Sequence, residues 1–289
     1  MDNAGGLFTF ANIFKKREMN KWLYIKWDVE PQIFEGFNLG YYNMLFVGGL
    51  VLCAFIIKRI FDSKKISEDV FTKLLFHCMI GIVIGARLGH CLFYEPSYYL
   101  HHPLEMILPF TFESGKFIVT GYRGLASHGG VIGLLAAIYL FSRRTSFGFL
   151  RTLDYIAIVA PLGSCFIRIG NLMNSEIIGR ETTVPWAFIF SRVDAMPRHP
   201  AQLYEAIAYS IMFVVMWTLY RKKGMSHFKT GFYFGLVLLM IFTFRFLVEF
   251  IKERQSAFEH GMLIDMGQIL SVPLILIGLF FVLRKKVCI

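Results

Sequence analysis

Long runs of apolar residues, separated by short polar stretches, dominate this sequence from about residue 39 to its end. A transmembrane helix needs roughly 20 predominantly apolar residues, and runs of about this length recur along the chain. We therefore expect an all-α, polytopic membrane domain over residues 39–289, preceded by an arm over residues 1–38. The seven expected spans cover residues 39–58, 74–94, 125–142, 154–173, 203–220, 230–250 and 264–283.

The basic residues that follow these spans predict the orientation of the chain. Lys and Arg are enriched in loops on the cytoplasmic side, and clusters of them follow alternate spans, beginning with the first. All the clusters lie on the same side of the membrane only if the chain crosses it seven times. If that side is the cytoplasm, the N-terminus lies outside and the C-terminus lies in the cytoplasm. The arm and the longer connections, residues 95–124, 174–202 and 251–263, then face outward. The clusters are Lys58, Arg59, Lys64 and Lys65; Arg143, Arg144 and Arg151; Arg221, Lys222, Lys223 and Lys229; and Arg284, Lys285 and Lys286.

The composition agrees with a membrane protein and argues against a nucleic-acid binder. Of the 289 residues, 56% are hydrophobic and only 17% are charged, whereas a soluble domain has about a quarter of its residues charged. The net charge of +10 comes largely from the loop clusters, which act as a topology signal and attract anionic lipid. The five cysteines have no C-x-x-C spacing and are expected to be free thiols.

Several charged or polar residues interrupt the apolar runs. A charge at the centre of the bilayer costs roughly 2.5–3.5 kcal/mol on insertion scales, so such residues are seldom accidental. Most of them fall towards the outer ends of the expected spans, which favours a shared cavity that opens outward. The residues are Arg87, His128, Arg168, Asn171, Glu176, His199, Arg245 and Glu249.

Each of these features also has a purely structural interpretation. Arg87 can snorkel or bridge two helices, and His128 stands beside two glycines that can serve close packing. The polar end of the fourth span can be an ordinary helix terminus. The remaining alternatives are a helix start at His199-Pro200, an N-cap at Asp154 and a local i,i+4 ion pair between Arg245 and Glu249.

Familiar catalytic motifs are missing from the sequence. It has no H-E-x-x-H, no close Asp cluster for Mg²⁺ and no P-loop, so we expect neither a metal nor another cofactor. Gly163-Ser164-Cys165 lacks the second glycine of a nucleophile elbow. An arginine-rich site that also contains histidine suits an anionic phospholipid, with a general base near its headgroup.

Polar motifs follow one another in a fixed order between about Tyr41 and Arg284. They are Gly85-Ala-Arg87-Leu-Gly89, His128-Gly-Gly, Arg168-Ile-Gly170-Asn171-x-x-Asn174-x-Glu176-x-x-Gly179-Arg180, Arg198-His199-Pro200-x-Gln202-Leu203-Tyr204-Glu205, Arg245-Phe246-x-x-Glu249-Phe250 and Met266-Gly267-Gln268-Ile-Leu-Ser271. In this order and at these spacings they resemble the prolipoprotein diacylglyceryl transferase family, and the stretch from Arg168 is the most specific of them. One departure is Gly40, which stands where the family often has histidine.

The resemblance implies a bacterial inner-membrane enzyme with its active site towards the periplasm. It would transfer the diacylglyceryl group of phosphatidylglycerol to the lipobox cysteine thiol of a preprolipoprotein and release glycerol 1-phosphate. The implied catalytic residues are His128, Arg168, Arg245 and Tyr42. The implied substrate-binding residues are Arg168, Asn171, Glu176, Gly179, Arg87, His199 and Glu249.

As a mechanism, we expect His128 to take the proton of the thiol, whose ordinary pKa is about 8.5. Arg168 and Arg245 would stabilise the departing phosphate, with Glu176 and Glu249 orienting the two guanidinium groups. Gly179 would allow a close approach of the backbone. The alternative is a non-catalytic binder or transporter of anionic phospholipid, and a weaker one is an intramembrane hydrolase.

Overall fold

The computed structural model describes residues 24–33, 40–107, 110–113, 116–119, 126–254 and 264–284. Of the expected arm over residues 1–38, only residues 24–33 are therefore described. Lys285 and Lys286 of the last basic cluster lie outside the described residues, as do parts of the outward segments 95–124 and 251–263.

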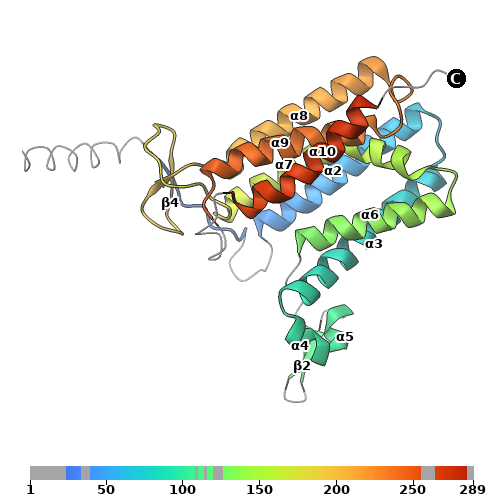
Figure 1. The fold of residues 1–289 in the computed structure, drawn as a ribbon. Helices are drawn as coiled ribbons and strands as arrows, with labels where there is room; N and C mark the ends of the chain where they lie inside the picture. Colours follow the sequence, from blue (N-terminus) through green and yellow to red (C-terminus); the bar gives the residue numbers. More distant parts are fainter. Residues whose placement is uncertain are drawn as a thin grey trace, which may run out of the picture. The chain divides into compact units, whose positions relative to one another are not determined.

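Each apolar run forms a long helix, and the helices extend up to several residues beyond the expected limits (Figure 1). Six of them are long and apolar enough to cross a membrane, and α6 is the long helix that is not among these six. The chain is thus a polytopic, multi-pass membrane protein, whereas seven crossings and the orientation stay predictions. The long helices are α2 (Tyr41–Ser63), α3 (Glu68–Phe93), α6 (Ser127–Arg144), α7 (Phe149–Met173), α8 (Ala201–Lys223), α9 (Phe232–Val248) and α10 (Met266–Leu283).

The outer surfaces of these helices carry many large apolar side chains. Val51 is 63% exposed, Phe76 59% and Phe280 61%. A soluble protein seldom exposes such side chains as a continuous surface, whereas lipid tails solvate them readily. The exposed apolar side chains therefore agree with a chain that lies in a bilayer.

The chain folds as two compact units, and their boundaries fall within α2 and α7. The smaller unit comprises residues 54–156, and the larger unit comprises residues 1–53 and 157–289. The smaller unit contains α3 and α6, two short helices, α4 (Pro96–His101) and α5 (Pro103–Ile107), and an antiparallel hairpin of β2 (Phe110–Glu113) and β3 (Lys116–Val119).

Helices α3 and α6 of the smaller unit pack through glycines (Figure 1). A Cβ atom on Gly129 would collide with the backbone of Gly85, and one on Gly89 would lie 2.7 Å from the Cα of Gly129. Small residues at four-residue spacing let helix backbones approach closely in a membrane. The glycines of the Gly85–Gly89 and His128-Gly-Gly motifs therefore serve helix packing, as the structural interpretation of the second motif predicted.

The predicted N-cap at Asp154 is wrong. Helix α7 begins five residues earlier, at Phe149, so Asp154 lies within the helix, where it is only 3% exposed. The polar residues at 151–154 belong to the first turns of a helix that continues into the apolar run.

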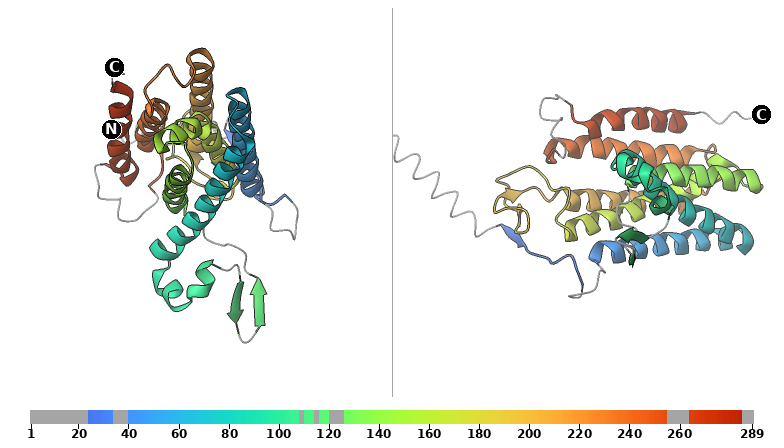
Figure 2. Two further views of the ribbon diagram at one scale, coloured as in Figure 1. Left: turned by 90° about the vertical axis from the view of Figure 1, so that its right-hand side faces the viewer. Right: turned by 90° about the horizontal axis from the view of Figure 1, so that it is seen from below.

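The larger unit contains α8, α9 and α10, which run side by side in all three views (Figures 1 and 2). Gly224, with φ of +71°, follows the last residue of α8, and Gly231, with φ of +96°, precedes the first residue of α9. Glycine adopts this left-handed conformation without a steric penalty, so the connection between these helices can stay short. The His199-Pro200 segment directly precedes α8, which confirms the predicted helix start there.

A small mixed sheet, which the sequence did not predict, lies at one end of the larger unit. Strand β1 (Ile25–Trp27) pairs in parallel with β4 (Phe188–Phe190), and β4 pairs antiparallel with β5 (Pro197–Arg198). The guanidinium of Arg198, in β5, lies 2.6 Å from a carboxylate oxygen of Asp194, in the turn before this strand. The hydrogen bonds from Arg198 hold the pKa of Asp194 below its ordinary value.

A Gly129→Ala substitution should destabilise the smaller unit. The added methyl group meets the backbone of Gly85, and overpacking of this kind costs about 1–3 kcal/mol. The thermal unfolding midpoint of the purified protein in detergent should fall. Gly130→Ala is the matched control, because its Cβ would lie 3.6 Å from Ala86, an ordinary contact. Equal midpoints for the two variants would refute the packing argument.

Acid should lower the stability of the folded protein, partly because it protonates Asp194. Because the folded-state pKa of this carboxyl is lowered, its stabilisation is fully present above its ordinary pKa of about 3.9 and is lost as the pH falls through the lower value. The stability difference between wild type and Asp194→Asn should therefore shrink below about pH 4. Unfolding midpoints measured from pH 7 to pH 3 test this.

Asp28→Asn is the control for the acid experiment, since its ion pair with Lys26 is exposed. If the Asp194→Asn and wild-type curves stay parallel over the whole range, the ion pair with Arg198 does not contribute as described.

Candidate functional site

The last two turns of α7 begin a chain of polar contacts in the larger unit. Arg168 Nη1 donates to Asn171 Oδ1 at 3.2 Å, and Asn171 Nδ2 donates to Glu176 Oε2 at 3.3 Å. The other oxygen of Glu176 accepts a bond from Asn174 Nδ2 at 3.0 Å. Asn171 thus connects the Arg168 guanidinium with the Glu176 carboxylate, and Asn174 contacts the carboxylate alone.

The turn that carries Glu176, residues 174–177, has an unusual backbone. Ser175 and Ile177 have φ of 55° and 58°, a left-handed conformation that is rare for a β-branched residue such as isoleucine. The Glu176 N–H donates to the Asn171 carbonyl at 2.9 Å, and the side-chain amide of Gln202 donates to the Glu176 carbonyl. These bonds fix Glu176 at the end of α7.

Glu205, on the first turns of α8, is the carboxylate that pairs directly with Arg168. Its Oε2 lies 3.1 Å from Arg168 Nε, and its side chain is completely buried. The Tyr209 hydroxyl donates to the other oxygen at 3.5 Å. A buried charge needs a partner of opposite sign because desolvation is expensive, so Glu205 fixes the position of Arg168.

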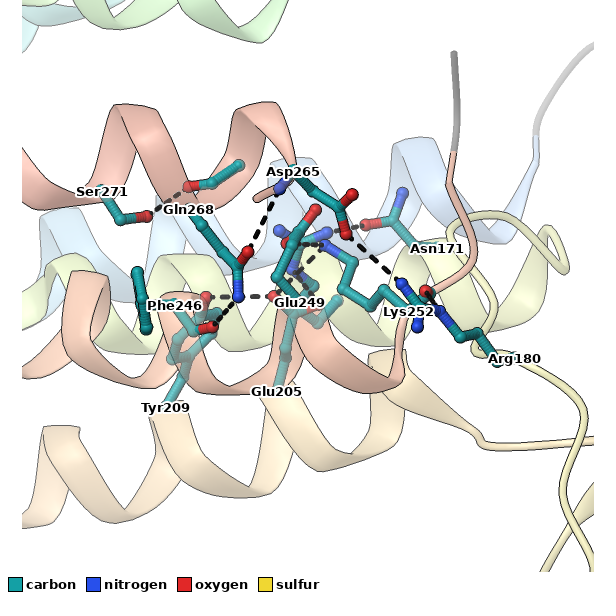
Figure 3. Close-up of polar contacts among 12 residues, drawn as sticks. Asn171, Arg180, Glu205, Tyr209, Phe246, Glu249, Lys252, Asp265, Gln268 and Ser271 are labelled. Atoms are coloured by element: carbon teal, nitrogen blue, oxygen red, sulfur yellow. Dashed lines mark hydrogen bonds and ion pairs between the residues drawn. The ribbon is translucent and has the colours of Figure 1, made fainter. Parts of the chain in front are cut away.

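Lys252 brings a further cation to this group (Figure 3). Its Nζ lies 3.3 Å from Glu249 Oε2 and 4.0 Å from Glu205 Oε1, and the residue is only 4% exposed. Burial lowers the pKa of the Lys252 ammonium, while the two carboxylates act in the opposite direction. Arg168 and Arg245 are both close enough to act electrostatically on Lys252. We call Arg168, Glu205, Arg245, Glu249 and Lys252 the ion cluster.

The local ion pair expected between Arg245 and Glu249 does not form. Helix α9 gives way at Glu249 to a 3₁₀ turn, η2 (Glu249–Ile251), which is followed directly by Lys252. Glu249 therefore pairs with Lys252. Within the described part of the chain, no carboxylate lies within ion-pair distance of the Arg245 guanidinium. Arg245 is thus the guanidinium of the ion cluster that has no carboxylate partner among these residues.

Glycines make room for two of the side chains expected in the site. A Cβ atom on Gly267 would lie 2.6 Å from Glu249 Oε1, so a larger residue at the start of α10 would displace this carboxylate. A Cβ on Gly170 would lie 2.8 Å from the ring of Tyr42. Tyr42 thus packs directly against α7, where Arg168 and Glu176 act on it electrostatically.

Gly179 lies in a close contact between backbone segments. A Cβ atom there would lie 2.6 Å from the His199 carbonyl and 2.9 Å from the Ile251 carbonyl. The Gly179 N–H donates to the first of these carbonyls at 2.9 Å, and Gly179 also forms a β-bridge with Lys252. The close approach predicted for this glycine is thus made by the segments before α8 and after α9. It joins the α7 turn to the segment that carries Lys252.

His199 lies at the edge of this contact. Its Nδ1 is 3.2 Å from the Tyr204 hydroxyl, and burial lowers the pKa of its imidazole. A polar cavity of about 420 Å³ lies beyond it, lined by Arg180, Glu181, Arg198, Glu253 and Arg254. The carboxylate of Asp265, the residue before α10, lies 3.4 Å from Arg180 (Figure 3). It also lies 2.9 Å from Arg254, so it connects this cavity lining with α10.

Arg87 and His128 belong to the smaller unit, whereas the ion cluster belongs to the larger one. The Arg87 guanidinium donates to the Glu105 carbonyl at 2.6 Å and lies over the Tyr99 ring. These contacts join α3 to α4 and α5, as the bridging interpretation expected. His128 is exposed on the first turn of α6. The site roles implied for these two residues stay predictions.

Sequence reasoning did not assign Glu205 or Lys252 to the site. Glu205 was available as a carboxylate within an expected span, four residues before a tyrosine on the same helix face. Lys252 had a weaker signal, because it falls just past an apolar run, where lysine is common. Its burial follows from η2 and from the bridge to Gly179.

Comparison with known proteins identifies the family of this chain. A family model described as prolipoprotein diacylglyceryl transferase matches residues 31–284. Proteins named phosphatidylglycerol–prolipoprotein diacylglyceryl transferase are similar throughout. The Bacteroides fragilis protein is 51% identical over 91% of this chain and 95% of its own length. The Chloroherpeton thalassium protein is 41% identical over 91% of this chain and 94% of its own length. The Tolumonas auensis protein is 43% identical over 89% of this chain and 96% of its own length. The chain therefore belongs to the prolipoprotein diacylglyceryl transferase family.

Proposed function

We propose that this protein transfers the diacylglyceryl group of phosphatidylglycerol to the lipobox cysteine of a preprolipoprotein. Family membership and the names of its relatives support this assignment. The observation in the structure that carries it is the ion cluster, in which Arg245 has no carboxylate partner among the described residues. A guanidinium in that position can bind the phosphate of an anionic lipid with paired hydrogen bonds.

The transfer is a substitution at carbon. The cysteine sulfur attacks the glyceryl carbon that carries the phosphate, so that a C–S bond forms and the C–O bond to phosphate breaks. The thiol gives its proton to a base, and the phosphate leaves as glycerol 1-phosphate with its bridging oxygen. Negative charge grows on that oxygen, so the step is accelerated by fixed cations near it.

The ion cluster supplies such cations in a fixed arrangement. Glu205 and Asn171 hold Arg168 from two sides, and Glu249 holds Lys252. Because these groups are already ordered, little reorganisation is needed when phosphate charge develops. Arg245 then serves as the main phosphate ligand, and Arg168 and Lys252 stabilise the leaving group. Tyr42, packed on Gly170, is suited to contact the lipid beside them.

The site is proposed to open to the periplasm from the bacterial inner membrane. The basic clusters support this orientation, since they follow alternate long helices. The ion cluster and the polar cavity lie at the other ends of α7 and α9, and at the starts of α8 and α10. The lipobox of a secreted precursor would then meet the headgroup on the outer side.

The assignment is tested with purified protein, labelled phosphatidylglycerol and a lipobox peptide. Thioether-linked diacylglyceryl peptide and glycerol phosphate should appear in equal amounts. A peptide with serine in place of the cysteine should yield neither product. Movement of unchanged lipid between vesicles without product would indicate a transporter, and release of diacylglycerol without the peptide would indicate a hydrolase.

Arg245→Lys should lower kcat while the protein stays folded. Lysine keeps the charge but lacks the two-pronged donor, and the loss of one preorganised donor costs on the order of 10²-fold in rate. The initial rate of glycerol phosphate release measures this. Arg221→Lys, at the far end of α8, is the control and should keep the wild-type rate. A full rate in Arg245→Lys would exclude paired phosphate recognition by this residue.

His128→Gln should slow the reaction more at neutral pH than at pH 9. If His128 is the base, its removal costs about 10²–10⁴-fold, and pre-ionisation of a thiol with pKa near 8.5 partly restores the rate. The pH profile of kcat measures this recovery. His101→Gln, another exposed histidine of the smaller unit, is the control. A wild-type rate at pH 7 in His128→Gln would assign the base to another group.

A further inference from the structure

Strand β1 of the N-terminal arm is joined to the end of α7 and to the strand beside it. The Ile25 N–H donates to the Ala187 carbonyl at 3.1 Å, and the Ser191 N–H donates to the Trp27 carbonyl at 3.0 Å. These bonds fix β1 along β4, with Trp27 opposite Phe190. Three residues of the arm are thus held by the backbone of the larger unit (Figure 2).

The side chain of Trp27 contacts α7 itself. Its indole Nε1 donates to the Leu172 carbonyl at 3.0 Å, and its ring lies 5.5 Å from that of Phe188. The last carbonyls of a helix have no partner within the helix. The Leu172 carbonyl also accepts a hydrogen bond from the Ser175 N–H at 3.1 Å, so the indole adds a second bond to a carbonyl that the turn already uses. The ring packs on a buried group formed by Leu172, Ile178, Phe188 and Phe190.

This group contacts both ends of the turn at residues 174–177. Leu172 precedes the turn and follows Asn171, whereas Ile178 follows the turn directly. The turn contains two non-glycine residues with positive φ, a conformation that persists only when the surroundings enforce it. Trp27 and its partners are the apolar part of those surroundings.

We propose that β1 is a clamp and that Trp27 is a positioning residue for the transfer. The clamp keeps the turn in its left-handed conformation, so that Glu176 and Asn171 meet and Asn171 holds Arg168. The inference rests on the proposed function. It goes beyond the family match, which begins at residue 31, after β1.

Three variants separate the parts of the clamp. Trp27→Phe keeps an aromatic ring but removes the N–H donor, and Trp27→Ala removes both. Ile25→Pro removes the backbone donor to Ala187 from a position whose side chain is already 47% exposed. Trp217→Phe is the matched control, because this tryptophan lies near the C-terminal end of α8, whereas the opposite end of the helix, at Gln202, contacts the turn.

Hydrogen exchange of the purified full-length protein, followed by mass spectrometry, reports on the clamp without any activity. Peptides that cover residues 172–179 should exchange about three- to tenfold faster in Trp27→Phe, the range expected for one lost hydrogen bond. Trp27→Ala and Ile25→Pro should exchange faster still, while peptides from α10 should not change. Unchanged exchange of residues 172–179 in Trp27→Ala and Ile25→Pro would overturn the proposal.

Kinetics then test the positioning role, at a temperature where all the variants are folded. In Trp27→Phe, kcat should fall by about three- to tenfold with little change in KM for phosphatidylglycerol, because Arg245 is untouched. Faster exchange with an unchanged kcat would also overturn the proposal. If the wild type itself forms no product, the proposed function fails, and the exchange experiment still decides whether β1 clamps the turn.

Discussion

The buried ion pair between Arg168 and Glu205 is the interaction on which the larger unit depends most. Glu205 is completely buried and Arg168 nearly so, and neither charge is tolerable there without the other. The pair joins α7 to α8, and Lys252 extends it to the end of α9 and to Glu249. These ion pairs thereby hold α7, α8 and the end of α9 together.

The glycines around the ion cluster follow from this arrangement. Charged groups can meet at about 3 Å only where the backbones that carry them come close, and side chains larger than hydrogen would prevent that. Gly267 gives space to the Glu249 carboxylate, and Gly179 lets the α7 turn touch the segment after η2. The strained turn at Ser175 and Ile177 serves the same purpose, because it brings the Glu176 side chain close to Asn171.

Sequence reasoning located the helices and the polar stretch after α7, because apolar runs and intramembrane charges are strong, local signals. It missed the partners of those charges. Arg245 and Glu249 are one turn apart, yet the 3₁₀ turn at the end of α9 directs Glu249 to Lys252. Strand β1 was missed because three residues carry almost no periodic signal, and its pairing partner lies 163 residues further on, at Ile25 and Phe188. The contact between β1 and β4 joins segments far apart along the chain, and local sequence patterns do not report such contacts.

A double-mutant cycle between Arg168 and Glu205 tests the central claim most directly. The unfolding free energy of Arg168→Gln, of Glu205→Gln and of the double variant would be measured in the same detergent. Each single variant should lose about 3–5 kcal/mol, since Glu205→Gln leaves Arg168 without a carboxylate partner and Arg168→Gln leaves Glu205 only the longer pair with Lys252, at 4.0 Å. The double variant should lose less than the sum, by about 0.5–3 kcal/mol. Losses that simply add would contradict the claim that this pair organises the site.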